Sequence, residues 1–262
     1  MANMTSSVSA SQVAGELASA TFEEIPALVE HYREDPRQQV IKACERALKR
    51  HAKELAERER VNDMYELMHE LGGDGVVVGV DEVGRGSVAG PLTVCAVCLP
   101  MEPRVWGIND SKKLTPARRE LLSVKIAEVA TAIGLCHIAP KDIDEMGMAR
   151  AIRTAVAGAV ADTGLEPDCV LMDGNPLGAV PNERDVVKGD AKIACIAAAS
   201  IMAKVTRDEM MVEHDAEYPE YHLAESKGYA SPEHIEAIRK HGLCPLHRVS
   251  FCGNFLQTER LF

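Results

Sequence analysis

Two adjacent carboxylates, Asp81 and Glu82, follow a short β-branched run. The run extends from Gly75 to Val80 and is typical of a buried strand. Carboxylates at a buried strand end cost free energy unless a cation meets them, and hard oxygen ligands suit Mg²⁺ or Mn²⁺. The pair therefore predicts a divalent-metal site where the strand ends. The alternative is a solvated turn that carries ordinary charges.

A glycine-flanked arginine comes next in the chain. Gly84 and Gly86 have no Cβ, so a ligand can approach the backbone there closely. Arg85 offers a planar, permanently charged fork that matches a phosphate. A metal site, exposed backbone and a phosphate-binding fork together indicate phosphodiester chemistry. A dinucleotide fingerprint is disfavoured, because Pro91 and a strand-like run follow the glycines where that motif requires a helix.

Two more carboxylates occupy similar positions further along. Asp173 follows a hydrophobic run, and Asp190 precedes a long predicted helix. Asp190 by itself is most simply a helix N-cap. It also becomes a candidate site residue, because the carboxylates at the two other strand ends need partner residues to complete a site. Sites gather at strand ends in α/β folds. Lys112 and Lys113 precede another predicted helix, where they fit either a phosphate backbone or a solvated surface pair.

Strands and helices alternate around these residues. Hydrophobic patterning predicts strands at 75–80, 92–99, 131–139, 169–172 and 184–188. It predicts helices at 117–130, 149–161 and 191–214, with another ending near residue 241, whereas 141–148 resembles an acidic turn. This alternation is typical of the α/β class.

The first 73 residues differ in character from the rest. Ser6 to Ser11 is polar and expected to be loose, and a helix is predicted over 22–32. Residues 38–71 are charge-rich and glycine-free, which predicts one or two long amphipathic helices. They form either a docked helical hairpin or an arm for a partner. A glycine-rich stretch at 72–75 predicts a hinge between a helical extension, 1–73, and a main domain with a C-terminal helical segment, 74–262.

Composition excludes several classes of protein. The 262 residues are 46% hydrophobic and carry a net charge of -11, which argues against non-specific coating of nucleic acid. No run approaches the ~20 apolar residues of a membrane span, and no secretory signal is evident. The eight cysteines have no paired zinc spacing, so we expect reduced thiols in a cytoplasmic protein.

Taken together, the separated motifs resemble those of bacterial ribonuclease HII. The resemblance covers Gly75 to Phe251, with departures at Gly147-Met148 and Ser226. It implies a ribonuclease H-like fold, in which a mixed five-stranded sheet is flanked by helices. The matching segments are Asp81 to Gly86, Ala89 to Pro91, Asp110 to Leu114, Asp173-Gly174, Gly189-Asp190, Ile196 to Ser200, Lys227 to Tyr229, His247-Arg248 and Ser250-Phe251.

The resemblance also implies a set of site residues. Two Mn²⁺ or Mg²⁺ ions and the catalytic chemistry are expected at four acids, Asp81, Glu82, Asp173 and Asp190. The ribose 2′-hydroxyl at an RNA–DNA junction is expected to be sensed by Gly84, Arg85, Gly86 and Tyr229. Phosphates are expected to be held by Arg85, Lys112, Lys113 and Lys227. Arginine at position 85 distinguishes the chain from ribonuclease HIII, which usually has threonine there.

The implied activity is hydrolysis of the RNA strand of RNA–DNA hybrids. It includes incision 5′ of single ribonucleotides in duplex DNA, leaving 5′-phosphate and 3′-hydroxyl ends, and it serves DNA replication and repair. Alternatives are another nuclease of the same fold, such as a DNA-junction resolvase, or a non-enzymatic scaffold built on the N-terminal arm. The tail from Gln257 to Phe262 resembles a sliding-clamp-binding segment, and we expect a monomer with no membrane partner.

Overall fold

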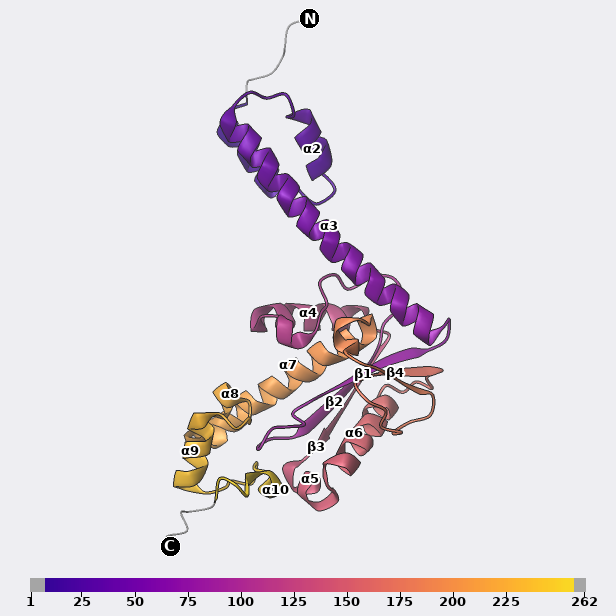
Figure 1. Cartoon of the computed structure of the whole chain (residues 1–262), viewed down its shortest axis with the longest axis vertical. Coiled ribbons are helices and arrows are strands. Elements are labelled where there is room, and N and C mark those ends of the chain that lie inside the picture. The colour runs from indigo at the N-terminus through magenta and orange to yellow at the C-terminus, as the bar shows by residue number, and fades with distance from the viewer. Residues whose placement is uncertain (1–7, 257–262) are drawn as a thin grey trace, which may run out of the picture. The chain divides into compact units, whose positions relative to one another are not determined.

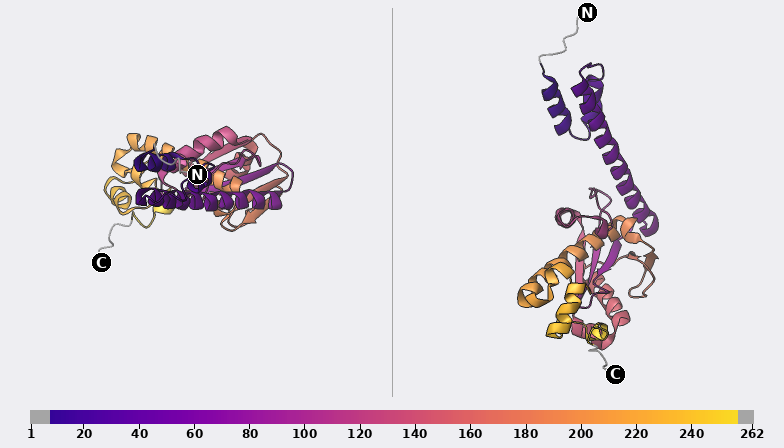
Figure 2. Two further views of the ribbon diagram at one scale, coloured as in Figure 1. Left: turned by 90° about the horizontal axis from the view of Figure 1, so that it is seen from above. Right: turned by 60° about the vertical axis from the view of Figure 1, so that its left-hand side comes forward.

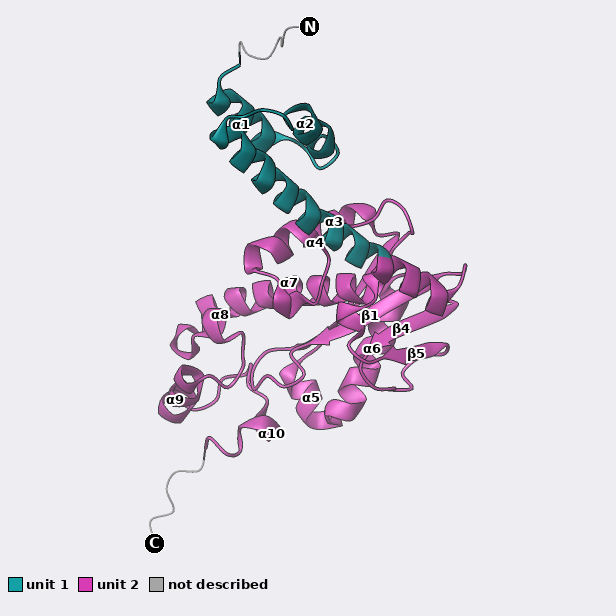
Figure 3. Cartoon of the chain, turned by 45° about the horizontal axis from the view of Figure 1, so that its top comes forward, with its two compact units in different colours: residues 1–62 teal, residues 63–262 magenta. Residues whose placement is uncertain are grey.

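The computed structural model describes residues 8–256, which belong to two compact units, residues 1–62 and 63–262 (Figure 3). The smaller unit is helical and contains α1 (Ala10–Ser19), α2 (Ile25–His31) and most of α3 (Gln38–Gly72) (Figure 1). Its apolar core is formed by Val13, Leu17, Ile25, Val40, Ala43 and Ala47.

Helix α1 corrects the expectation of a loose segment at Ser6 to Ser11, as far as that segment is described. Ser9 accepts a hydrogen bond from the Gln12 backbone, and the Gln12 side chain accepts one from the Ser9 backbone. This capping box starts a helix that the polar composition had hidden. The helix over 38–71 is a single element, α3, which ends at the glycine-rich stretch. The two compact units divide inside α3, and the domain limits 1–73 and 74–262 stay a prediction.

The larger unit is built on a five-stranded sheet in the order β3-β2-β1-β4-β5. Strand β1 pairs with β2 and β2 with β3 in the antiparallel sense, whereas β1 pairs with β4 and β4 with β5 in parallel. The expected mixed sheet is therefore confirmed. Its strands are β1 (Val77–Val83), β2 (Leu92–Cys98), β3 (Ala132–Ile138), β4 (Cys169–Asp173) and β5 (Glu183–Val186).

Two long helices cover opposite faces of this sheet, as Figure 1 and Figure 2 show. Helix α6 (Met148–Asp162) packs on the face that carries Val78 and Val80. Helix α7 (Ala194–Glu217) packs on the other face, at Gly79. A Cβ on Gly79 would lie 2.3 Å from the carbonyl carbon of Cys195, so glycine is required for α7 to approach β1 this closely.

The other helices of the larger unit lie between the strands, between β5 and α7, or after α7. They are α4 (Pro116–Val129), α5 (Pro140–Met146), α8 (Leu223–Ser226), α9 (Pro232–His241), α10 (Val249–Cys252) and three 3₁₀ helices, Ser111–Lys113, Gly189–Ala191 and Pro219–Tyr221.

Helix α5 corrects the predicted acidic turn at 141–148. Pro140 occupies its first turn, Ile143 is buried beneath it, and Gly147 ends it with a φ of 78°. Two buried apolar residues, Pro140 and Ile143, anchor this short helix, which is too little for hydrophobic periodicity to reveal. All eight cysteines carry free thiols. Within residues 8–256, no helix combines the length and the apolar character needed to cross a membrane.

Candidate active site

The register of the sheet brings Asp81 and Asp173 side by side. Val80 pairs with Met172 in the parallel β1–β4 ladder, so the next residue of each strand is an aspartate. Because side chains alternate along a strand, both aspartates lie on the α7 face, like Gly79, while Glu82 starts toward the α6 face. Asp81 and Glu82 were predicted to follow the strand. They lie within it, since β1 continues to Val83 paired with Thr93 of β2.

Asp190 reaches the same edge from a different direction. It is buried in the 3₁₀ helix Gly189–Ala191, and α7 begins only at Ala194, so the N-cap interpretation is wrong. The backbone N–H of Gly189 donates to Asp173 Oδ1 at 2.7 Å. A Cβ at Gly189 would lie 2.6 Å from Ile196 Cδ1, so glycine allows this turn to pack against α7. Asp81, Glu82, Asp173 and Asp190 are called the acidic edge below.

Burial and mutual repulsion disturb the ionisation of the acidic edge. Burial, followed by the charges of Glu82 and Asp173, raises the pKa of Asp81 to about 8, although a hydrogen bond from Ser200 counteracts this. Burial also raises the pKa of Glu82, with Asp173 adding to it and Arg85 opposing it. The pKa of Asp190 is raised by burial first and by Asp173 second. The charge of Asp173 therefore helps to raise the pKa of each of the three other acids.

Little positive charge compensates this edge. Lys112 Nζ lies 3.9 Å from Asp190 Oδ2, but the lysine side chain is 80% exposed, and Arg85 Nη1 lies 3.5 Å from Glu82 Oε1. In the described part of the chain, no three His, Cys, Asp or Glu side chains converge into a ready-made metal cage. An oxygen-only donor set in which Asp81, Glu82 and Asp190 have raised pKa values nevertheless fits a hard divalent cation, which would relieve the repulsion between the carboxylates.

A cavity of about 350 Å³ opens beside these acids. Two residues of the acidic edge, Asp173 and Asp190, line this cavity together with Lys112 and Lys113. The paired lysines predicted to hold phosphate thus share one cavity with two of the predicted metal ligands. Asp110, whose side chain accepts a hydrogen bond from the Lys112 backbone, also lines it and had no role in the sequence reasoning.

The two glycines that flank Arg85 serve different purposes. Gly84 has a φ of 83°, and a Cβ there would lie 2.3 Å from the buried Nε of Arg207. Gly84 is therefore required by the protein's own packing, which corrects the interpretation that ligand approach explains both glycines. Nothing lies within 4 Å of a Cβ at Gly86, so its backbone is open. The Arg85 side chain is 59% exposed.

Two fully buried arginines, which sequence reasoning left without a role, organise this region. Arg207 donates to four neutral oxygens, namely Pro91 O, Lys227 O, Ala89 O and Ser87 Oγ, at 2.7–3.1 Å. Arg248 donates to Gly90 O and Arg85 O. We call these arginines, with segments 84–91 and 227–229, the arginine frame. The sequence could have indicated the burial of Arg207, because Ala203, Arg207 and Met211 are spaced four residues apart and therefore lie on one face of α7, which is buried.

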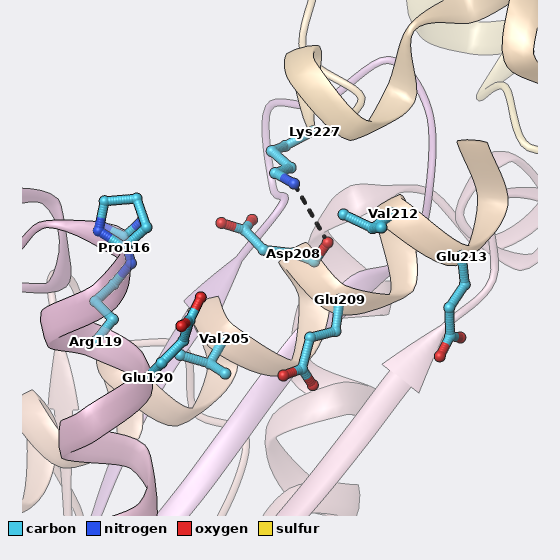
Figure 4. A pocket seen from close by; sticks show the side chains of 9 residues that line it. All are labelled: Pro116, Arg119, Glu120, Val205, Asp208, Glu209, Val212, Glu213 and Lys227. Atoms are coloured by element: carbon cyan, nitrogen blue, oxygen red, sulfur yellow. Dashed lines mark hydrogen bonds between the residues drawn. The ribbon is translucent and has the colours of Figure 1, made fainter. Parts of the chain in front are cut away.

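Tyr229 and Lys227 emerge from this frame in different directions. The Tyr229 ring is 40% exposed and lies 5.7 Å from the Arg207 guanidinium carbon. Lys227 Nζ donates to the Asp208 carbonyl at 3.5 Å and lines a separate groove of about 420 Å³ between α4 and α7 (Figure 4). The structure thus brings Lys112 and Lys113 to the cavity of the acidic edge, and it does not bring Lys227 there.

The fold matches solved ribonucleases H of the second and third types. The ribonuclease H2 of Pyrococcus horikoshii OT3 is 27% identical, with a TM-score of 0.59 covering 70% of this chain and 99% of that one. Bst-RNase HIII, solved with Mn²⁺, is 19% identical with a TM-score of 0.56, covering 70% and 68%, and it bears on the fold alone. The mixed sheet and its acidic residues therefore define a ribonuclease H-like protein.

Sequence comparison narrows the class to one family. The profile described as Ribonuclease HII matches residues 78–254, and that of the Ribonuclease HII N-terminal domain matches residues 9–71. Ribonuclease HII of Ruminiclostridium cellulolyticum is 43% identical over 77% of this chain and 80% of its own. That of Moorella thermoacetica is 46% identical over 74% and 96%. The chain belongs to the ribonuclease HII family, as its motifs predicted.

Family membership establishes the general activity. The protein is a ribonuclease H, an endonuclease that hydrolyses RNA in RNA–DNA hybrids, and enzymes of this family depend on divalent metal ions. The non-enzymatic scaffold considered from the sequence is thereby set aside.

Proposed function

We propose that this ribonuclease H also incises 5′ of single ribonucleotides embedded in duplex DNA, leaving 5′-phosphate and 3′-hydroxyl ends. The observation that carries the proposal is the arginine frame, which holds the open backbone of Gly86 and the exposed ring of Tyr229 near β1, the strand of Asp81 and Glu82. A protein distinguishes RNA from DNA at one position only through the 2′-hydroxyl. A single ribonucleotide offers one such group, so a fixed reading site beside the catalytic edge suits this substrate.

The acidic edge would carry catalysis. Its four carboxylates would hold two Mn²⁺ or Mg²⁺ ions, which when bound supply an activated water and stabilise the leaving 3′-oxygen. Asp81 would be a central ligand of this set, because burial and the charges of Glu82 and Asp173 raise its pKa and a bound cation would relieve that cost. The Gly189 N–H orients the Asp173 carboxylate, and the Glu82 backbone N–H orients that of Asp81.

Substrate contacts would divide between the cavity and the arginine frame. Lys112 and Lys113 would bind backbone phosphates at the cavity, and Arg85 would bind the phosphate next to the ribonucleotide. The backbone of Gly84 to Gly86 and the Tyr229 hydroxyl would read the 2′-hydroxyl. A phosphate role for Lys227 requires its side chain to leave the groove beside Asp208.

Cellular aspects belong to the same proposal. We assign ribonucleotide removal during DNA replication and repair, by a monomer in the cytoplasm, to residues 74–262, with 1–73 as an extension.

The proposed clamp-binding tail, residues 257–262, lies outside the described residues. Truncation at residue 256 is expected to abolish any binding to the bacterial sliding clamp in a pull-down with purified components and to leave hydrolysis of free hybrid unchanged.

Replacement of Asp81 by asparagine tests the proposed chemistry. Asp81→Asn keeps the shape of the side chain and removes its charge, so incision of a duplex with one ribonucleotide should fall by at least about 10³-fold while the duplex still binds. Single-turnover cleavage and gel-shift assays measure the two effects. Glu128→Gln, on the exposed side of α4, is the matched control and should cleave normally.

Three outcomes would contradict this proposal. Near-normal cleavage by Asp81→Asn would remove Asp81 from the metal ligands. Equal cleavage of an all-DNA junction by the unmodified enzyme would favour the resolvase alternative. Product ends other than 5′-phosphate and 3′-hydroxyl would refute the assigned position of cleavage.

A further inference from the structure

A buried pair of histidines lies directly behind the Tyr229 backbone. His234 occupies the first turn of α9, with its Nδ1 atom 2.9 Å from the carbonyl oxygen of Tyr229. Its other nitrogen, Nε2, lies 3.1 Å from Nε2 of His247. His247 Nδ1 in turn lies 3.0 Å from the backbone nitrogen of Cys244. Both imidazoles are almost completely buried, with relative exposures of 0% and 3%.

The partners fix the position of every proton in this chain of contacts. A carbonyl oxygen only accepts, so His234 carries its proton on Nδ1. His247 Nδ1 lies 3.0 Å from the Cys244 backbone N–H, which only donates, and 3.4 Å from the Cys244 carbonyl oxygen. The shorter contact makes Nδ1 an acceptor and places the His247 proton on Nε2. The Nε2–Nε2 contact then runs from His247 to His234, and both rings are neutral. A further proton on either ring would place two donors face to face.

The surroundings of the pair favour this neutral state. Burial lowers the pKa of His234, and burial followed by the His234 charge lowers the pKa of His247 to about 4. His234 also lies at the positive end of α9, which opposes a cation. The titratable groups that face the pair are Tyr221, whose ring stacks edge-on against both imidazoles, Cys244, and the more distant His222 and Glu220. In the described residues no carboxylate contacts an imidazole nitrogen of the pair, and the neutral Cys244 thiol lies with its Sγ atom 3.2 Å from His247 Nδ1.

We propose that His234 and His247 act as positioning residues, a neutral hydrogen-bond relay in which His247 holds His234 in the tautomer that donates to the Tyr229 carbonyl and so fixes Tyr229 for recognition of an embedded ribonucleotide. The inference rests on the proposed function of Tyr229. Other bonds already hold the residues before it, since Arg207 donates to Lys227 O, and Val88 and Ala89 donate to Gly228 O. At Tyr229 itself, the carbonyl accepts from the Ser231 backbone and from His234. His234 is thus the buried side chain that holds the Tyr229 backbone, while the buried Arg207 guanidinium faces its ring.

Two substitutions of His234 separate positioning from general structural support. The amide nitrogen of asparagine can occupy the place of Nδ1 and is always a donor, so His234→Asn keeps the bond to Tyr229 without needing His247 to set a tautomer. Glutamine reaches the place of Nε2 instead, so His234→Gln loses the bond to Tyr229. The measurement is the ratio of kcat/KM for a duplex with one ribonucleotide to kcat/KM for a long RNA–DNA hybrid. Glutamine should lower this ratio about tenfold, and asparagine less than about threefold, as expected for one hydrogen bond.

A double substitution tests whether His234 acts through Tyr229. In a Tyr229→Ala background, His234→Gln should lower the ratio no further. Additive losses, or equal losses with asparagine and glutamine, would overturn the relay. If Tyr229→Ala lowers the ratio and His234→Gln does not, the relay fails while the proposed function stands. If Tyr229→Ala itself leaves the ratio unchanged, the proposed role of Tyr229 fails, and the relay has no functional consequence.

The unmodified protein provides a test that does not depend on variants folding. Histidine side-chain ¹⁵N NMR of the full chain distinguishes the two neutral tautomers and the cation. Near neutral pH, His234 should be protonated on Nδ1 alone and His247 on Nε2 alone. A proton on Nε2 of His234, or a charged ring at either position, would overturn the proposal.

Discussion

The acidic edge and the arginine frame both bury charge, but the two regions satisfy it differently. At the acidic edge, Asp81 and Asp190 are buried among other carboxylates, and their pKa values are raised. In the frame, Arg207 and Arg248 are fully buried, and their guanidinium groups donate to carbonyl and hydroxyl oxygens. Burial, and then repulsion by Arg207, lowers the pKa of Arg248 to about 10, which still leaves it charged at neutral pH.

The difference separates a binding site from a scaffold. A carboxylate with a raised pKa can relieve its burial by taking a proton or a metal ion, so the acidic edge is completed by a ligand. An arginine keeps its charge, and its fork is stabilised when its N–H groups are hydrogen-bonded, so the frame is complete without a ligand. Substitutions in the two regions should therefore have opposite effects on stability.

Removal of the Arg207 guanidinium should have the largest effect on stability. Arg207→Met fills a similar volume but leaves Pro91 O, Lys227 O and Ala89 O without their donor. We expect a loss of about 3–5 kcal/mol in the free energy of unfolding, measured by urea denaturation. Arg85→Met, at an exposed arginine, is the control and should change stability by less than about 0.5 kcal/mol. Similar values for the two variants would show that Arg207 does not support the frame.

Substitution in the acidic edge should have the opposite sign when metal is absent. The pKa of Asp81 is about 8 in the folded state and 3.8 as the reference for the unfolded chain. Between these values the folded state binds more protons, so the free energy of unfolding decreases as pH rises toward 8. Asp81→Asn removes this dependence and should stabilise the metal-free protein at pH 8 by at least about 1 kcal/mol.

Thermal unfolding with and without metal checks this prediction. In EDTA at pH 8, the variant should melt a few degrees above the unmodified protein. Saturating Mn²⁺ should raise the Tm of the unmodified protein and have little effect on the variant. The lowered pKa values of His234 and His247 make the free energy of unfolding decrease as pH falls below about 6.5, which is the opposite trend. Both proteins contain these histidines, so comparing the two proteins at each pH cancels this contribution. A variant less stable than the unmodified protein would contradict the argument.

Sequence patterns predicted those features of the two regions that depend on residues close together in the chain. The β-branched run before Asp81 and the hydrophobic run before Asp173 identified two strands. The register that makes these aspartates neighbours depends on pairing across some 90 residues and cannot be derived from either run alone. Asp190 was misjudged as a cap because a 3₁₀ turn and a helix start look alike in sequence.

The frame and the histidine relay have almost no local signal. Arg207 accepts its burial because segments far away in the chain supply oxygens, and His234 is neutral because His247 and the Tyr229 carbonyl face it. Gly84 illustrates the same limit: its sequence context suggested a ligand, and the side chain that excludes a Cβ comes from α7. Long-range packing decides these roles, and periodicity and motif spacing do not encode it.

The two glycines beside Arg85 provide the smallest and most selective test. Gly86→Ala adds a methyl group where nothing lies within 4 Å, and φ there is not in the left-handed region, so stability should change by less than about 0.5 kcal/mol. Gly84→Ala is the matched variant. It combines a φ of 83° with a clash against Arg207, so it should lose about 2 kcal/mol or more. Urea denaturation of both variants measures this difference.

The activity of Gly86→Ala tests whether the backbone at Gly86 contributes to substrate recognition. If the backbone at Gly86 reads the 2′-hydroxyl, a methyl group on its open side should lower kcat/KM for an embedded ribonucleotide about tenfold or more in a protein of unchanged stability. Gly84→Ala should lose activity in parallel with its folded fraction, because its defect lies in the frame. If Gly86→Ala instead cleaves normally, the open backbone has no role in recognition. The reading site would then have to be sought at the side chains of Tyr229 and Arg85, the other exposed groups of the frame with a predicted role in recognition.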